Sequence, residues 1–129
     1  MNDFQVGIRH EEMVTVFDLQ GYLDAHTAPD LEQAFLNAID GKRFNLVVNF
    51  RDLAYISSAG LGVLMQFIED VRKHDGDIKL TNMSTRVYNV FDLLGFPMLY
   101  EIFAEEKEAL AKYRNNAAGI PYERPGTED

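Results

Sequence analysis

The chain has 129 residues, a single-domain length that can bury a core, and no cysteine, which excludes disulfides and thiolate metal sites. Its formal net charge of −9, from 21 acidic and 12 basic residues, makes it a poor ligand for nucleic acid, which favours basic surfaces. It shows no signal peptide at its start and no apolar run near the roughly 20 residues of a membrane helix, so we expect a cytoplasmic protein without membrane contact.

The N-terminal residues predict a β-hairpin. Residues 4–9 alternate apolar with polar side chains, which is typical of a half-buried strand. A turn is expected at residues 10–12 and a second strand at residues 13–20, which Gly21 ends.

A helix is expected next. Thr27 is a candidate N-cap, Pro29 suits the first turn, and Asp30 places a negative charge near the positive end of the helix dipole. Apolar residues then recur on one face until Asp40 and Gly41 stop the helix.

The centre of the chain predicts a buried strand, a loop and a second helix. Residues 44–50 are apolar enough to be covered on both faces, and residues 51–54 lead from this strand to a loop. The helix is expected from about Ser58 to His74. Its apolar face consists of Leu61, Leu64, Met65, Ile68 and Val71.

The second half predicts shorter elements. We expect a strand at residues 78–80, a third helix between its cap Ser84 and Gly95, an edge strand at residues 99–103 and a charged helix at residues 105–113. The residues expected to face the core on the two helices are Val87, Val90, Phe91, Leu94, Ala109, Leu110 and Tyr113.

This order of elements indicates an α/β fold with parallel crossovers. Its functional site is expected where the central strand ends, because open α/β sheets place their sites at the carboxyl ends of strands. We expect one domain over residues 1–114. Residues 115–129 lose periodicity and gain proline and glycine, which predicts a disordered tail.

The strand–helix junction after the central strand contains Ser57, Ser58, Gly60 and Gly62. The free N–H groups of a helix start favour negative charge, so a serine hydroxyl there is a plausible phosphate acceptor. A simpler interpretation stays open, in which one serine only caps the helix and the glycines only permit close packing.

Three segments carry a family resemblance. Residues 52–64 resemble the signature of the STAS domain, and more narrowly that of the bacterial anti-sigma factor antagonists, whose motif is Asp-Ser-Ser/Thr-Gly-Leu-Gly. Ser57 stands at the Asp of this motif, and Ala59 at its second hydroxyl residue. Residues 21–24 resemble the family's Gly-x-Leu/Ile-Asp, and residues 91–96 the end of its third helix.

The resemblance implies a STAS fold, a small mixed sheet of about five strands packed by about four helices. It also implies a partner-switching regulator that is not an enzyme and needs no cofactor or metal. A serine-kinase anti-sigma factor would bind the unphosphorylated protein and phosphorylate Ser58, and a serine phosphatase would reverse this. The expected partner-binding residues are Asp24, Ser57, Ser58, Ala59, Gly60 and Leu61. A side chain at Gly60 is expected to block the kinase, and the protein to be a monomer or weak dimer.

Other chemistries find less support. A hydrolase elbow would need a glycine two residues before its serine, and Ile56 precedes Ser58 by two. No histidine is placed as an evident base, no metal-ligand spacing is present, and the P-loop ending is absent. Asp24 alone is explained equally well as a turn residue. Two alternatives remain: an unphosphorylated STAS scaffold or transport-system subunit, and a small-molecule-binding α/β domain.

Overall fold

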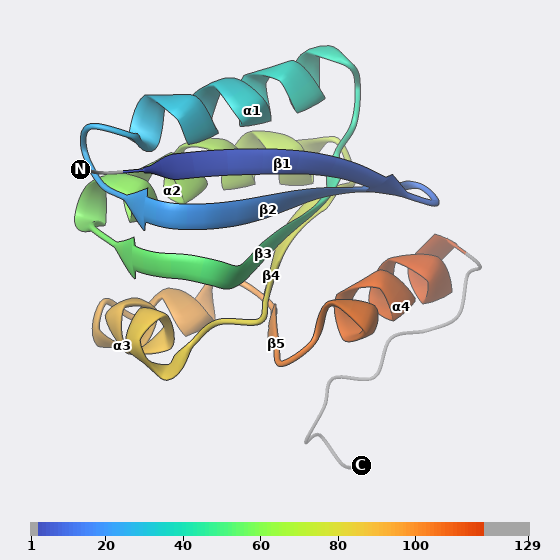
Figure 1. Cartoon of the computed structure of the whole chain (residues 1–129). Coiled ribbons are helices and arrows are strands. Elements are labelled where there is room, and N and C mark those ends of the chain that lie inside the picture. The colour runs from blue at the N-terminus through green and yellow to red at the C-terminus, as the bar shows by residue number, and fades with distance from the viewer. Residues whose placement is uncertain (1–2, 118–129) are drawn as a thin grey trace, which may run out of the picture.

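The computed structural model describes residues 3–117 and has a five-stranded mixed sheet with four α-helices (Figure 1). The strand order is β1-β2-β3-β4-β5, with β1 antiparallel to β2 and the other neighbours parallel. The elements are β1 (Phe4–Glu11), β2 (Val14–Leu23), α1 (Ala28–Asp40), β3 (Asn45–Ile56), α2 (Ser58–Lys73), β4 (Asp77–Thr81), α3 (Thr85–Leu93), the 3-10 helix η1 (Phe96–Met98), β5 (Ile102–Phe103) and α4 (Glu106–Ala117). The predicted α/β fold is confirmed.

The sheet is covered on both faces. Figure 1 shows α1 and α2 on one side and α4 on the other. The larger core contains buried side chains of α1, α2 and α3 packed on β2, β3 and β4, with Phe35 stacked on Phe67 at 5.2 Å between ring centroids. A smaller core lies under α4, where Ala109 and Tyr113 cover Val47. This burial explains why residues 44–50 are almost continuously apolar.

The hairpin differs from its prediction at both ends. β1 continues to Glu11, so the expected turn at residues 10–12 is misplaced and lies at residues 12–13. β2 does not end at Gly21 but runs through it to Leu23. Gly21 has φ +96°, and a Cβ there would collide with the carbonyl oxygen of Asp3. The glycine thus permits a positive φ within a strand and does not terminate it.

β3 extends to Ile56, so the prediction that residues 51–54 form a lead-in is wrong. The register between β2 and β3 shifts twice, between Asp18 and Gln20 and between Gly21 and Tyr22. These bulge-like irregularities break the alternation of buried and exposed residues from which strands are predicted. The junction with α2 is consequently a single residue, Ser57.

The later elements also show differences. Leu94 is the C-cap of α3 and 52% exposed, so its predicted core position is wrong, whereas Val87 and Phe91 are fully buried. The edge strand contains only residues 102–103, because η1 precedes it. α4 continues to Ala117, so residues 115–117 of the expected tail are helical, and the remainder lies outside the described residues.

Two partly buried carboxylates hold α4 and the strands beneath it. The Glu101 carboxylate accepts hydrogen bonds from Lys79 Nζ at 2.5 Å and from Lys112 Nζ at 2.6 Å. Burial alone would raise the pKa of Glu101, but the two lysines outweigh burial and hold that pKa below its usual range. Glu106 has a lowered pKa for the same reason, with Arg9 and Asn49 as donors.

These lowered pKa values predict acid sensitivity. Glu101 and Glu106 keep their charge in the folded protein at pH values where the same groups in the unfolded chain, with a pKa of about 4.3, already bind protons. The free energy of unfolding therefore decreases as the pH falls from the unfolded pKa through the lower folded pKa values. Urea denaturation between neutral pH and about pH 3 should show this loss. In Glu101→Gln the loss should be shallower. An unchanged acid slope in that variant would remove Glu101 from the explanation.

Candidate functional site

The candidate site lies where β2 and β3 end side by side. The register pairs Leu23 with Ile56, and the Ser57 N–H donates to the Leu23 carbonyl at 2.9 Å. Asp24 and Ser57 are therefore the first residues beyond two neighbouring parallel strands. This is the carboxyl edge at which α/β sheets place their sites, so the structure brings the two predicted loops together.

The two serines have different roles. Ser57 is the N-cap of α2, and its side chain accepts a hydrogen bond from the Ala59 N–H at 3.2 Å. Ser58 is the first helical residue and is exposed. Within residues 3–117, its hydroxyl forms no hydrogen bond. The capping interpretation therefore holds for Ser57 and leaves the Ser58 hydroxyl accessible.

Removal of the Ser57 cap gives a first prediction for this site. Ser57→Ala should lower the free energy of unfolding by about 1 kcal/mol, because the Ala59 N–H loses its acceptor. Ser57→Asp should keep most of this stability, since aspartate caps as well as serine. Chemical denaturation of both variants measures the difference. Equal stability of Ser57→Ala and the original protein would contradict the capping role.

The backbone at the start of α2 favours an anion beside Ser58. The first helical N–H groups have no intrahelical acceptor, and the first such bond here runs from the Leu61 N–H to the Ser57 carbonyl at 3.2 Å. The helix dipole adds positive potential at this end. A phosphate on Ser58 would consequently be tolerated by the fold.

Asp24 organises the turn between β2 and α1. Its Oδ1 accepts hydrogen bonds from the N–H groups of His26 and Thr27, at 3.0 and 3.1 Å. Thr27 occupies the N-cap position of α1, but the prediction that its side chain caps the helix is wrong. The Thr27 hydroxyl instead donates to the Tyr22 carbonyl at 2.8 Å. Asp24 therefore has the turn role that its residue type allows, at a half-buried position beside the α2 start.

Gly60 and Leu61 face the interior. A Cβ on Gly60 would lie 2.7 Å from Leu23 Cγ and 3.0 Å from Ile56 Cγ1. The expectation that a side chain at Gly60 would block an approaching kinase is therefore wrong, because that side chain would point at the sheet. Leu61 is 2% exposed, and Ala59 is half-buried against the same core. Gly60 permits the close approach of α2 that positions Ser58.

The family model described as STAS domain matches residues 5–109. The chain belongs to the STAS domain family. The Anti-sigma-B factor antagonist of Bacillus subtilis is 27% identical over 105 residues, which cover 81% of this chain and 95% of that protein.

Two solved structures of SpoIIAA are similar in sequence and fold. The anti-sigma factor antagonist SpoIIAA in its unphosphorylated form has a TM-score of 0.72 and 26% identity, covering 93% of this chain and 100% of the other. The phosphorylated form, described as a Bacillus cell fate determinant, has a TM-score of 0.67 and 25% identity over 87% and 100% of the two chains. A relative with a similar fold has thus been solved in both its unphosphorylated and its phosphorylated form.

This STAS domain also presents an aromatic pair that sequence reasoning missed. Tyr22 and Tyr55 are 46% and 44% exposed, with ring centroids 6.0 Å apart. The register places them opposite each other, one residue before the ends of β2 and β3. Each tyrosine is visible in the sequence, but their pairing depends on the two register shifts and has no sequence signal.

Gly62 was recognised in the motif, but its open position on the surface of this STAS domain was not predicted. It lies one helical turn after Ser58, is exposed, and would place a Cβ in open space. The open surface beside Ser58 that an approaching protein would need is therefore found at Gly62 and not at Gly60.

The remaining kinds of site to consider here are a metal centre, a serine–histidine pair and a small-molecule pocket beside Ser58. Within residues 3–117, no group of three His, Asp or Glu side chains could hold a metal ion, and no hydrogen bond joins Ser58 to a histidine. The groove between β1 and α1 does not include Ser57 or Ser58. In the same described part of the chain, no helix is long and apolar enough to span a membrane.

Proposed function

We propose that this STAS domain is an anti-sigma factor antagonist that works by partner switching. Unphosphorylated, it binds a serine-kinase anti-sigma factor and so releases a sequestered sigma factor. The kinase phosphorylates Ser58 and the complex separates, and a serine phosphatase restores binding. The single observation that carries this proposal is the exposed Ser58 hydroxyl at the start of α2, which forms no hydrogen bond within residues 3–117, in a chain whose relatives carry the antagonist name.

The proposed switch acts on the binding surface and leaves the core unchanged. Phosphorylation adds about −1.5 to −2 charges at neutral pH. The α2 N-terminus tolerates this charge in the free protein, but a partner surface packed over Ser58 would have to desolvate it. A loss of a few kcal/mol is sufficient to separate the complex, because about 1.4 kcal/mol changes affinity tenfold.

The proposed contact surface surrounds Ser58 and is partly apolar. Tyr22 and Tyr55 supply exposed aromatic area of the kind enriched in interface hot spots, and Gly62 leaves room for close approach along α2. Asp24 holds the neighbouring turn through its Oδ1. A partner with a basic or neutral surface fits the net charge of −9.

One observation favours a second candidate, a STAS scaffold that is never phosphorylated. Ser57 stands at the aspartate of the family motif, so the acceptor lacks a carboxylate neighbour at that position. In the scaffold, Ser57 and Ser58 would serve only as the α2 start.

Affinity capture of the unmodified protein from its native cells distinguishes the two candidates. We expect a serine-kinase anti-sigma factor among the captured proteins. That protein should be lost when the bait carries phosphoserine at residue 58. A Gly62→Leu bait, which fills the open surface beside Ser58, should also lose it. Capture of partners that include no kinase, and that bind both phosphorylation states equally, would favour the scaffold.

A further inference from the structure

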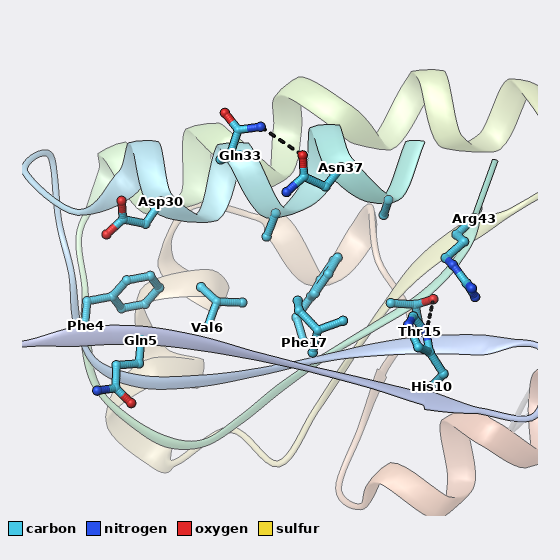
Figure 2. Close-up of a pocket in the computed structure, with 13 residues that line it drawn as sticks. Phe4, Gln5, Val6, His10, Thr15, Phe17, Asp30, Gln33, Asn37 and Arg43 are labelled. Carbon is cyan, nitrogen blue, oxygen red and sulfur yellow. Dashed lines mark hydrogen bonds between the residues drawn. The ribbon is translucent and has the colours of Figure 1, made fainter. Parts of the chain in front are cut away.

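A groove of about 640 Å³ lies between the edge strand β1 and helix α1 (Figure 2). It exists because α1 is anchored away from the sheet edge. Phe35 of α1 packs against Phe17 of β2 and Phe67 of α2, with ring centroids 4.9 and 5.2 Å away. The inward face of β1 is left incompletely covered, and Ile8 is 48% exposed there.

The groove has an apolar floor and polar walls. Val6 and Ile8 of β1, Phe17 of β2 and Ala34 of α1 are among the residues that line it. The small side chain of Ala34 keeps the groove open on the helix side. This combination and volume match the small-molecule pockets of proteins, which are mostly apolar with a few convergent polar groups and measure roughly 300–1,000 Å³.

The two ends of the groove differ in charge. Figure 2 shows Asp30 near Phe4 at one end, and Arg43 with His10 at the other. Within residues 3–117, the Arg43 side chain forms no ion pair or hydrogen bond. The His10 ring is oriented by a 3.2 Å hydrogen bond between its Nδ1 and Thr15 Oγ1. The Arg43 guanidinium at the groove is thus available to an anion, in a protein whose net charge is −9.

We propose that this groove binds an amphipathic anion, a small molecule with an apolar chain and a carboxylate headgroup. The chain lies on the floor along β1, and the carboxylate pairs with the Arg43 guanidinium beside His10. From Phe4 to His10 the strand spans about 20 Å, which accommodates an extended alkyl chain. This binding is separate from the proposed phosphorylation, because Ser58 does not line the groove.

Dodecanoate, below its micelle concentration, is the probe. Titration into the full chain, followed by backbone amide chemical shifts, should perturb β1, α1 and the loop at Arg43. Arg43→Gln should weaken binding about tenfold or more, since a charge-assisted bond is lost. Lys42→Gln is the matched control, because it removes the neighbouring positive charge outside the groove lining, and it should bind normally. Dodecyltrimethylammonium, with the opposite headgroup charge, should bind more weakly than dodecanoate.

Groove filling gives an independent test. Ala34→Leu should abolish dodecanoate binding while thermal unfolding remains cooperative, and Ser58→Ala should bind dodecanoate normally. The proposal is overturned if dodecanoate perturbs no groove residue, if Arg43→Gln and Lys42→Gln bind equally, or if both headgroups bind alike. Sedimentation of the free protein as a dimer that Ala34→Leu dissociates would also overturn it, because a second copy would then occupy the groove.

Discussion

Replacement of Ser58 by alanine should abolish phosphorylation by the cognate kinase while leaving the fold and kinase binding intact. The side chain is exposed and forms no hydrogen bond within residues 3–117, so its truncation leaves no buried group unsatisfied. The free energy of unfolding should change by less than about 0.5 kcal/mol. Incorporation of labelled phosphate from ATP measures the first effect, and chemical denaturation the second.

A matched control is available in Ser84. Like Ser58, it is exposed at the start of a helix. It caps α3 as Ser57 caps α2, and its Oγ accepts a hydrogen bond from the Val87 N–H at 3.1 Å. Ser84→Ala should be phosphorylated like the original protein, and Ser58→Asp should bind the kinase weakly. If Ser58→Ala and the original protein were phosphorylated equally, Ser58 would not be the acceptor.

The second large effect is expected at Gly60. In Gly60→Ala the new Cβ would lie 2.7 Å from Leu23 Cγ, so α2 or Leu23 must move. Such overpacking costs about 1–3 kcal/mol, whereas glycine to alanine inside an exposed helix ordinarily gains about 0.5–1 kcal/mol. The variant should therefore unfold at lower urea concentration. Because the shift moves the start of α2, it should also slow phosphorylation of Ser58.

Gly62→Ala is the control that isolates packing from helix propensity. Among the described residues 3–117, its Cβ meets nothing within 4 Å, so the propensity gain should appear without strain and raise the free energy of unfolding. Urea denaturation of the two variants should thus show changes of opposite sign. If both variants were stabilised alike, the close contact of Gly60 with Leu23 would not govern the position of α2.

Structural features that depend on residues close together in the chain were predicted from the sequence, and those that depend on strand irregularities or on where an element ends were not. The helices were predicted because apolar residues recur with helical spacing. The Ser84 cap was predicted because a serine stands just before the first residue of such a face, and the structure confirms it with a hydrogen bond from the Val87 N–H to Ser84 Oγ. The length of β3 was missed because the apolar run on which the strand was predicted stops at Phe50, and the exposed Arg51 and Asp52 that follow lie in an irregular part of the strand. Leu94 fits the helical spacing but falls where α3 has already ended.

At the candidate site, too, the locally determined feature was predicted and the features that depend on tertiary packing were not. The motif placed Ser58 at the α2 start, since a strand–helix junction is a local feature. The inward direction of Gly60 depends on how closely α2 approaches Leu23, and the Tyr22–Tyr55 pair depends on strand register. The groove beside β1 depends on where Phe35 anchors α1. These are consequences of tertiary packing, which one sequence does not display.

Phosphosite mapping by mass spectrometry, on the protein taken from its native cells, tests directly whether Ser58 is the switch residue. We predict phosphate on Ser58 in a fraction of the molecules, with an occupancy that changes with growth condition. Ser57, whose hydroxyl accepts from the Ala59 N–H, should remain unmodified. Unmodified Ser58 across many conditions, in an abundant protein, would contradict the partner-switching account and favour the unphosphorylated scaffold.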